Sequence, residues 1–183
     1  FPLAAYKEVA KEIEKRVEAQ GVHLMFGVTI DHMEQENGEK TAVLTDGSRI
    51  PADIVGLCIG TRAITETVQG EVEIGRGIVV DDHMRTSVPG IYAAGDCCEG
   101  NNLESGQNQI IGLWANANHQ GETAGINMAG GDMAYKGNIL HNITHFMNMD
   151  FIGFGDNRMQ GEVLEYGSLS EDLYIRLVLD GKR

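Results

Sequence analysis

The stretch "TSVPGIYAAGDCCEG", residues 86–100, is the most informative part of the sequence. A proline-glycine turn and a short apolar run predict a strand that finishes at Ile91 and Tyr92. Gly95 has no Cβ, so the backbone there can approach another molecule closely. An ionised carboxylate at Asp96 needs donors, and the hydroxyls of a bound polyol or ribose would each supply a charge-assisted hydrogen bond. The alternative is that Asp96 only caps a turn.

Downstream of this corner, the sequence predicts a helix over residues 110–128 that ends at Gly130 and Gly131. Its expected apolar stripe comprises Leu113, Ala117, Ala124 and Met128. A strand, a glycine-aspartate corner, a loop and a helix in this order direct a partly positive helix N-terminus toward whatever Asp96 holds. A ligand with hydroxyls and an electron-rich, anionic end would fit.

Upstream, apolar residues recur at helical spacing and predict a first helix that ends near Gln20. The β-like residues that follow are interrupted by "NG" at 37–38 and "DG" at 46–47, which are turn dipeptides of hairpins. We expect one strand directly after Gly21, then a three-stranded meander.

Residues 54–59 are apolar at nearly every position, which predicts a strand covered on both faces in a parallel sheet. Gly60 ends this run and would let a ligand approach the carboxyl end of the sheet. The alternative is that Gly60 is a plain strand-ending glycine.

The 183 residues are 42% hydrophobic and carry a formal net charge of −13, which indicates a globular protein that repels nucleic acid and anionic membrane surfaces. No apolar run approaches the roughly 20 residues that span a bilayer. Three cysteines make neither a disulfide framework nor a CxxC pair. We therefore expect a cytoplasmic protein without a nucleic-acid or membrane partner.

Two clusters could suggest redox or metal chemistry. Adjacent Cys97 and Cys98 would strain a mutual disulfide, so we expect free thiols. The run from Asp81 to His83 is expected to be a solvated turn rather than a metal site, because consecutive side chains on an extended segment point in opposite directions. We expect no metal.

The pattern from Thr86 to Asp96 (threonine, five residues, an aromatic residue, Ala, any residue, Gly, Asp) resembles the second FAD-binding motif of the pyridine nucleotide-disulfide oxidoreductase family. "ADIVGLCIGTR", residues 52–62, is similar to the segment that leads from that family's NAD-binding domain back into its FAD domain. "ANANHQGETAGINMAGG", residues 115–131, is similar to its Ala-x-x-Gln-Gly helix. The likeness is strongest to NADH oxidases, rubredoxin reductases and FAD-containing nitrite reductase subunits.

The resemblance implies that Asp96, with Gly95, binds the ribityl hydroxyls of FAD. It places Ile111 and Gly112, at the start of the second helix, against the flavin ring, and it makes Gly60 a further cofactor-binding position. The implied fold is α/β, an incomplete two-dinucleotide-domain FAD/NAD(P) fold with the start of an α+β interface domain. The expected domains are the end of the NAD(P)-binding domain (1–62), the end of the FAD domain (63–133) and the start of the interface domain (134–183).

The resemblance further implies hydride transfer from NAD(P)H to FAD, an electron acceptor that the sequence does not identify, and a homo-oligomer. Two departures stand out: Ala63-Ile64 replaces the usual Pro-Asn, and G-x-G-x-x-G is absent from the sequence. We therefore expect the C-terminal part of a longer flavoprotein, inactive alone, since both ends look cut. The competing hypothesis is a non-enzymatic dimerisation or partner-binding module that retains the fold.

Overall fold

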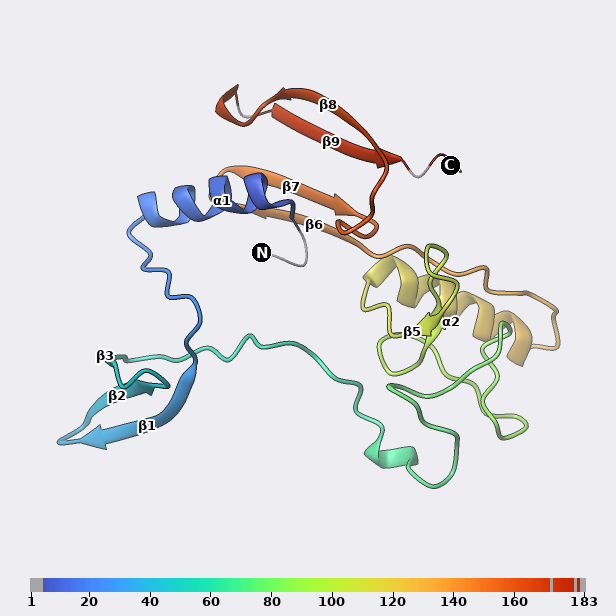
Figure 1. Cartoon of the computed structure of the whole chain (residues 1–183). Coiled ribbons are helices and arrows are strands. Elements are labelled where there is room, and N and C mark those ends of the chain that lie inside the picture. Colours follow the sequence, from blue (N-terminus) through green and yellow to red (C-terminus); the bar gives the residue numbers. More distant parts are fainter. Residues whose placement is uncertain (1–4, 172, 180, 182–183) are drawn as a thin grey trace. The chain divides into compact units, whose positions relative to one another are not determined.

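The computed structural model describes residues 5–171, 173–179 and 181. The chain forms two compact units: one is Ala10–Gly60, and the other combines the residues before it with those from Thr61 onward (Figure 1). Its helices and strands are α1 (Lys7–Ala19), β1 (Ile30–Glu36), β2 (Glu39–Leu44), β3 (Arg49–Pro51), the 3₁₀ turn η1 (Glu66–Val68), β4 (Gly100–Asn101), β5 (Asn108–Gln109), α2 (Trp114–Met128), β6 (His141–Phe146), β7 (Met149–Phe154), β8 (Glu162–Ser168), η2 (Leu169–Glu171) and β9 (Leu173–Leu179).

The expected first helix is confirmed as α1. It buries Ala10, Ile13 and Val17, which lie three and four residues apart and so share one face. The Gly21 amide donates to the Glu18 carbonyl at 2.9 Å, and the positive φ of 84° at Gly21 ends the helix.

The meander is also confirmed: β1, β2 and β3 form an antiparallel sheet in that order. Asn37 and Gly38 both have positive φ, 52° and 89°, as a two-residue hairpin turn requires. The sheet's buried residues come from the end of β2, at Ala42, Val43 and Leu44. Arg49 on β3 forms an ion pair with Glu34 on β1 across the exposed face.

The expected parallel strand at 54–59 is wrong, as is the strand expected directly after Gly21: both segments are irregular. Ile54 and Ile59 are 91% and 87% exposed. A strand of this composition is stable only where neighbouring strands pair with it and helices cover it. Within the described residues no strand pairs with 54–59, so its apolar side chains remain in solvent.

In the unit that contains the residues from Thr61 onward, α2 packs against a layer of turns and isolated bridges rather than a regular sheet. The core cluster comprises Val72, Ile78, Val80, Met84, Ala93, Cys98, Ala124 and Tyr135. The strand expected at Ile91 and Tyr92 is reduced to a single antiparallel bridge between Arg85 and Tyr92. Ile78 pairs in parallel with Cys98, so hydrogen bonding continues only locally.

Two antiparallel hairpins, β6–β7 and β8–β9, end the described chain. Met147 and Asn148 form the β6–β7 turn with φ of 48° and 57°, the left-handed pair that suits a two-residue hairpin loop. Ile143 and Ile152 are directly paired and are 71% and 68% exposed, so the hairpin presents an apolar surface.

Candidate functional site

The loop before Asp96 is held by Thr86. The Thr86 hydroxyl accepts a hydrogen bond from the Val88 amide at 3.2 Å and donates one to the Ile91 carbonyl at 3.1 Å. The Thr86 amide donates to the same carbonyl at 2.9 Å. This threonine therefore closes the turn that leads into the corner, which is a structural reason for its place in the motif.

Gly95 and Asp96 form the corner. Gly95 has a φ of 87°, a conformation that favours glycine, and its amide donates to Gln120 Oε1 at 2.9 Å. Asp96 is exposed, and among the described residues none donates a hydrogen bond to its carboxylate. The corner thus presents a free acceptor on a fixed backbone, and Asp96 does not act as a turn cap.

The structure brings Ile111 and Gly112 next to this corner. A Cβ built on Gly112 would lie 3.9 Å from Asp96 Oδ2. Ile111 is only 1% exposed, and its carbonyl accepts from Asn116 Nδ2 at 3.0 Å. The exposed backbone of Gly112 can therefore face a ligand, whereas the Ile111 side chain supports the site from within the core.

The start of the second helix is a correction, because α2 begins at Trp114 rather than near residue 110. Residues 108–109 instead form β5, which pairs with β4. No side chain caps α2 at Leu113, and its first turn holds no acidic residue. The positive end of the helix dipole is therefore not neutralised by its own side chains.

The buried face of α2 is also a correction, because it is largely polar. Its buried residues are Asn116, Gln120, Thr123, Ala124 and Asn127. Met128, expected in the apolar stripe, is 66% exposed. The burial of Asn116, Gln120 and Asn127 was not predicted from the sequence, although their spacing of four and seven residues is a signal that places them on one helix face.

These buried amides hold loops rather than one another. Asn127 Nδ2 donates to the His83 and Met133 carbonyls at 3.0 and 2.8 Å. Asn116 accepts from the Tyr135 hydroxyl. The hydrogen bonds of Asn116 and Asn127 compensate for the desolvation of these two amides and fix irregular backbone that no sheet stabilises.

The cysteines are free thiols, as expected. Cys98 is 1% exposed, and its single S–H can donate to either the Gly95 carbonyl, 3.5 Å from Sγ, or Gln120 Oε1, 3.6 Å away. Burial raises the pKa of the Cys98 thiol to about 12. A thiol held protonated is a poor nucleophile, so Cys98 supports the corner and is not suited to redox chemistry.

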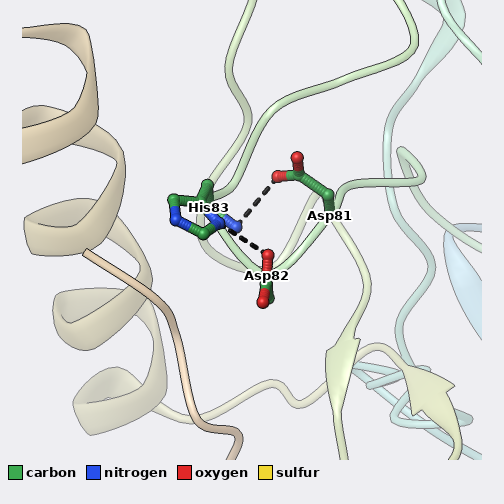
Figure 2. Close-up of side chains that lie close together, drawn as sticks. All are labelled: Asp81, Asp82 and His83. Carbon is green, nitrogen blue, oxygen red and sulfur yellow. Dashed lines mark hydrogen bonds and ion pairs between the residues drawn. The ribbon is translucent and has the colours of Figure 1, made fainter. Parts of the chain in front are cut away.

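The solvated turn expected at 81–83 is confirmed, but the expectation that the side chains of Asp81, Asp82 and His83 diverge is wrong, because they lie together (Figure 2). The segment is a turn and not an extended strand, and Asp81 Oδ1 accepts from the His83 amide at 2.9 Å. His83 Nδ1 lies 2.6 Å from Asp82 Oδ1, and its Nε2 lies 2.8 Å from Asp132 Oδ1. These two carboxylates, Asp82 foremost, raise the pKa of His83. His83 therefore bridges Asp82 in its own turn and Asp132 in a loop 49 residues away, and these two contacts form an ionic clamp when the imidazole is protonated.

Gly60 belongs to the other compact unit, Ala10–Gly60. It is exposed with a φ of 118°, a backbone conformation that favours glycine. Its role as a cofactor-binding position stays a prediction.

A glycine-aspartate corner beside the start of a helix, within a mixed α/β fold, is the arrangement that the resemblance to FAD/NAD-binding oxidoreductases leads one to expect. The family model for pyridine nucleotide-disulphide oxidoreductase matches residues 3–121, and the chain belongs to this family. The resemblance seen in the sequence is thereby confirmed.

Individual relatives agree. The chain is 33% identical over 128 residues to an NADH oxidase of Enterococcus faecalis, an alignment that covers 68% of this chain and 29% of the relative. A water-forming NADH oxidase from Lactobacillus brevis, solved with NADH bound, superposes with a TM-score of 0.82 at 26% identity, covering 90% of this chain and 39% of that one. An FAD-dependent pyridine nucleotide-disulphide oxidoreductase from Desulfovibrio vulgaris gives a TM-score of 0.78 at 27% identity, covering 90% and 44%.

The chain thus spans about a third of the length of the curated relative. Within the residues that the structure describes, no helix combines the length and apolar character needed to cross a membrane.

Proposed function

We propose that this chain is the C-terminal part of an FAD-dependent NAD(P)H oxidoreductase. Family membership supports the class of enzyme. The share of its relatives that the chain covers, and the absence of a G-x-G-x-x-G loop from its sequence, support the view that the pyrophosphate-binding parts lie outside these 183 residues.

The free carboxylate of Asp96 is the observation that carries the proposal. A carboxylate accepts hydrogen bonds only, and the hydroxyls of the FAD ribityl chain are donors, so the two are complementary. Gly112 lies beside Asp96 and is exposed, so its backbone can approach a ligand bound at this carboxylate. The uncapped N-terminus of α2 favours an electron-rich, anionic group near it.

When bound, FAD supplies the two-electron chemistry, accepting a hydride from NAD(P)H and giving electrons to an acceptor. The residues of this chain bind and orient: Asp96 holds the ribityl hydroxyls, Gly112 lines the site with backbone, and α2 provides a favourable electrostatic field. Gly60 and residues 52–59 are proposed to border the NAD(P)H-binding domain. The acceptor is unassigned, and a cytoplasmic location is part of the proposal.

The test replaces Asp96 in the intact protein. Losing a hydrogen bond to a charged group costs about 1.5–3 kcal/mol, so Asp96→Ala should weaken FAD binding by about tenfold or more. The control is Glu122→Ala, which removes an exposed carboxylate that lies on α2 instead of at the corner, and this variant should bind FAD like the wild type. Flavin fluorescence titration measures both affinities. Unchanged affinity in Asp96→Ala would overturn the assignment.

A second observation bears on the alternative of a non-enzymatic module. The exposed pair Ile143 and Ile152 on β6–β7 favours self-association, and we propose a homo-oligomer. Association suits either function, so the coding sequence upstream of residue 1 discriminates between them. A glycine-rich dinucleotide fingerprint there supports the enzyme, whereas an in-frame stop codon supports the module.

A further inference from the structure

Gln120 lies in the middle of α2 and is completely buried, with 0% of its surface exposed. Its Oε1 accepts hydrogen bonds from the Gly95 amide at 2.9 Å and from Cys98 Sγ at 3.6 Å. Its Nε2 has no hydrogen-bond partner among the described residues. A buried amide used only through its carbonyl is costly, since the unpartnered NH₂ group has lost its water. An apolar side chain of the same length would fill the space without that cost, so the acceptor is what the position requires.

The orientation of the Gln120 amide follows from its neighbours. Exchanging Oε1 and Nε2 would place the NH₂ group against the Gly95 N–H, which can only donate. The Nε2 side of the amide faces Gly100 closely, since a Cβ built on Gly100 would lie 2.5 Å from Nε2, and the side chain is fully buried. The side chain therefore has little freedom to release Gly95.

Gln120 acts on the residue next to Asp96. Gly95 is the most pliant residue of the corner, and its amide is fixed by Gln120 alone among the described side chains. One helical turn earlier on the same face, Asn116 holds the Ile111 carbonyl beside Gly112. The two amides thus hold the two backbone segments next to the Asp96 carboxylate, Gln120 at Gly95 and Asn116 at Ile111.

We propose that Gln120 is a positioning residue for the FAD site: by binding the Gly95 amide, it holds the Asp96 carboxylate in the place where the ribityl hydroxyls meet it. The inference rests on the proposed role of Asp96. Gln120 itself does not contact the cofactor, and its effect on FAD binding depends wholly on Asp96.

The test is a double-mutant cycle in the intact flavoprotein. Gln120→Met keeps the length of the side chain and removes the acceptor, and it should weaken FAD binding by about threefold to tenfold, the usual effect of one hydrogen bond. In the Asp96→Ala background the same substitution should have almost no effect, because coupled residues are non-additive. Thr123→Val is the control: Thr123 is equally buried on α2, and its hydroxyl donates only to the His119 carbonyl of the same helix. It should bind FAD as the wild type does.

The outcomes are distinct. If Asp96→Ala binds FAD normally, the proposed function fails. If Asp96→Ala weakens binding but Gln120→Met costs the same in both backgrounds, Gln120 is merely structural and the positioning role is overturned. Hydrogen exchange of the Gly95 amide in the wild-type protein decides the matter should Gln120→Met not fold: strong protection is expected, and exchange at the rate of an exposed amide would overturn the inference.

Discussion

Replacing Gly100 with alanine probes the tightest contact beneath the site. The new Cβ would lie 2.5 Å from Gln120 Nε2 and 3.3 Å from the Tyr135 hydroxyl. The end of a glutamine side chain can usually move, but Gln120 is fully buried and its Oε1 is bound to Gly95. The extra methyl group must therefore either strain the core or break that hydrogen bond.

The magnitude follows from two opposing terms. Overpacking of a well-packed core costs about 1–3 kcal/mol. A Gly→Ala change also lowers the entropy of the unfolded chain, which raises the free energy of unfolding by about 0.4–1 kcal/mol. Gly100→Ala should therefore lower the free energy of unfolding by about 1–2 kcal/mol, or the Tm by about 2–8 °C for a chain of this size.

The assay is thermal unfolding followed by circular dichroism, with Gly121→Ala as the matched control. A Cβ on Gly121 meets nothing within 4 Å, and the residue lies inside α2, so alanine should stabilise the helix by up to about 1 kcal/mol. The two substitutions are chemically identical and should shift the Tm in opposite directions. A Gly100→Ala protein as stable as Gly121→Ala would refute the tight packing of Gln120 against Gly100.

The remaining predictions concern pH, assembly and cofactor binding. Asp82 and Asp132 raise the pKa of His83 above its ordinary value of 6.5. The ion pairs of His83 therefore stabilise the folded chain fully below about pH 6.5, and this stabilisation is lost as the pH rises through the raised pKa. The Tm difference between wild type and His83→Gln should shrink accordingly, and a difference independent of pH would contradict the clamp. Light scattering should show a dimer or larger species that Ile152→Glu dissociates, whereas a wild-type monomer at high concentration would count against assembly through β6–β7. The 183-residue chain alone should bind FAD only with a millimolar or weaker Kd, because it lacks a glycine-rich pyrophosphate loop; a retained yellow flavin band would disprove this.

Local signals in the sequence were sufficient for several features. The spacing from Thr86 to Asp96 identified the family, and the turn dipeptide at 37–38 predicted the β1–β2 hairpin. These features depend on φ preferences and on residues close in sequence, which act before any tertiary contact forms. For the same reason α1 could be predicted from apolar spacing alone.

Other features depended on partners that are distant in sequence. The run at 54–59 reads as a buried strand, yet it is irregular because strand formation needs neighbouring strands to pair with it. A solvated turn was expected at 81–83, but the convergence of its side chains was not. The His83 clamp also requires Asp132, which lies 49 residues away.

The candidate site divides in the same way. Its sequence gives Gly95, Asp96 and Gly112, but the closeness of Gly112 to the Asp96 carboxylate is a property of the folded chain. The same holds for Gln120: the sequence places it in the Ala-x-x-Gln-Gly segment, but only the fold shows that it is buried against Gly95. A sequence records which groups can donate or accept, whereas only tertiary packing decides which of them lose water and must therefore find a partner in the protein.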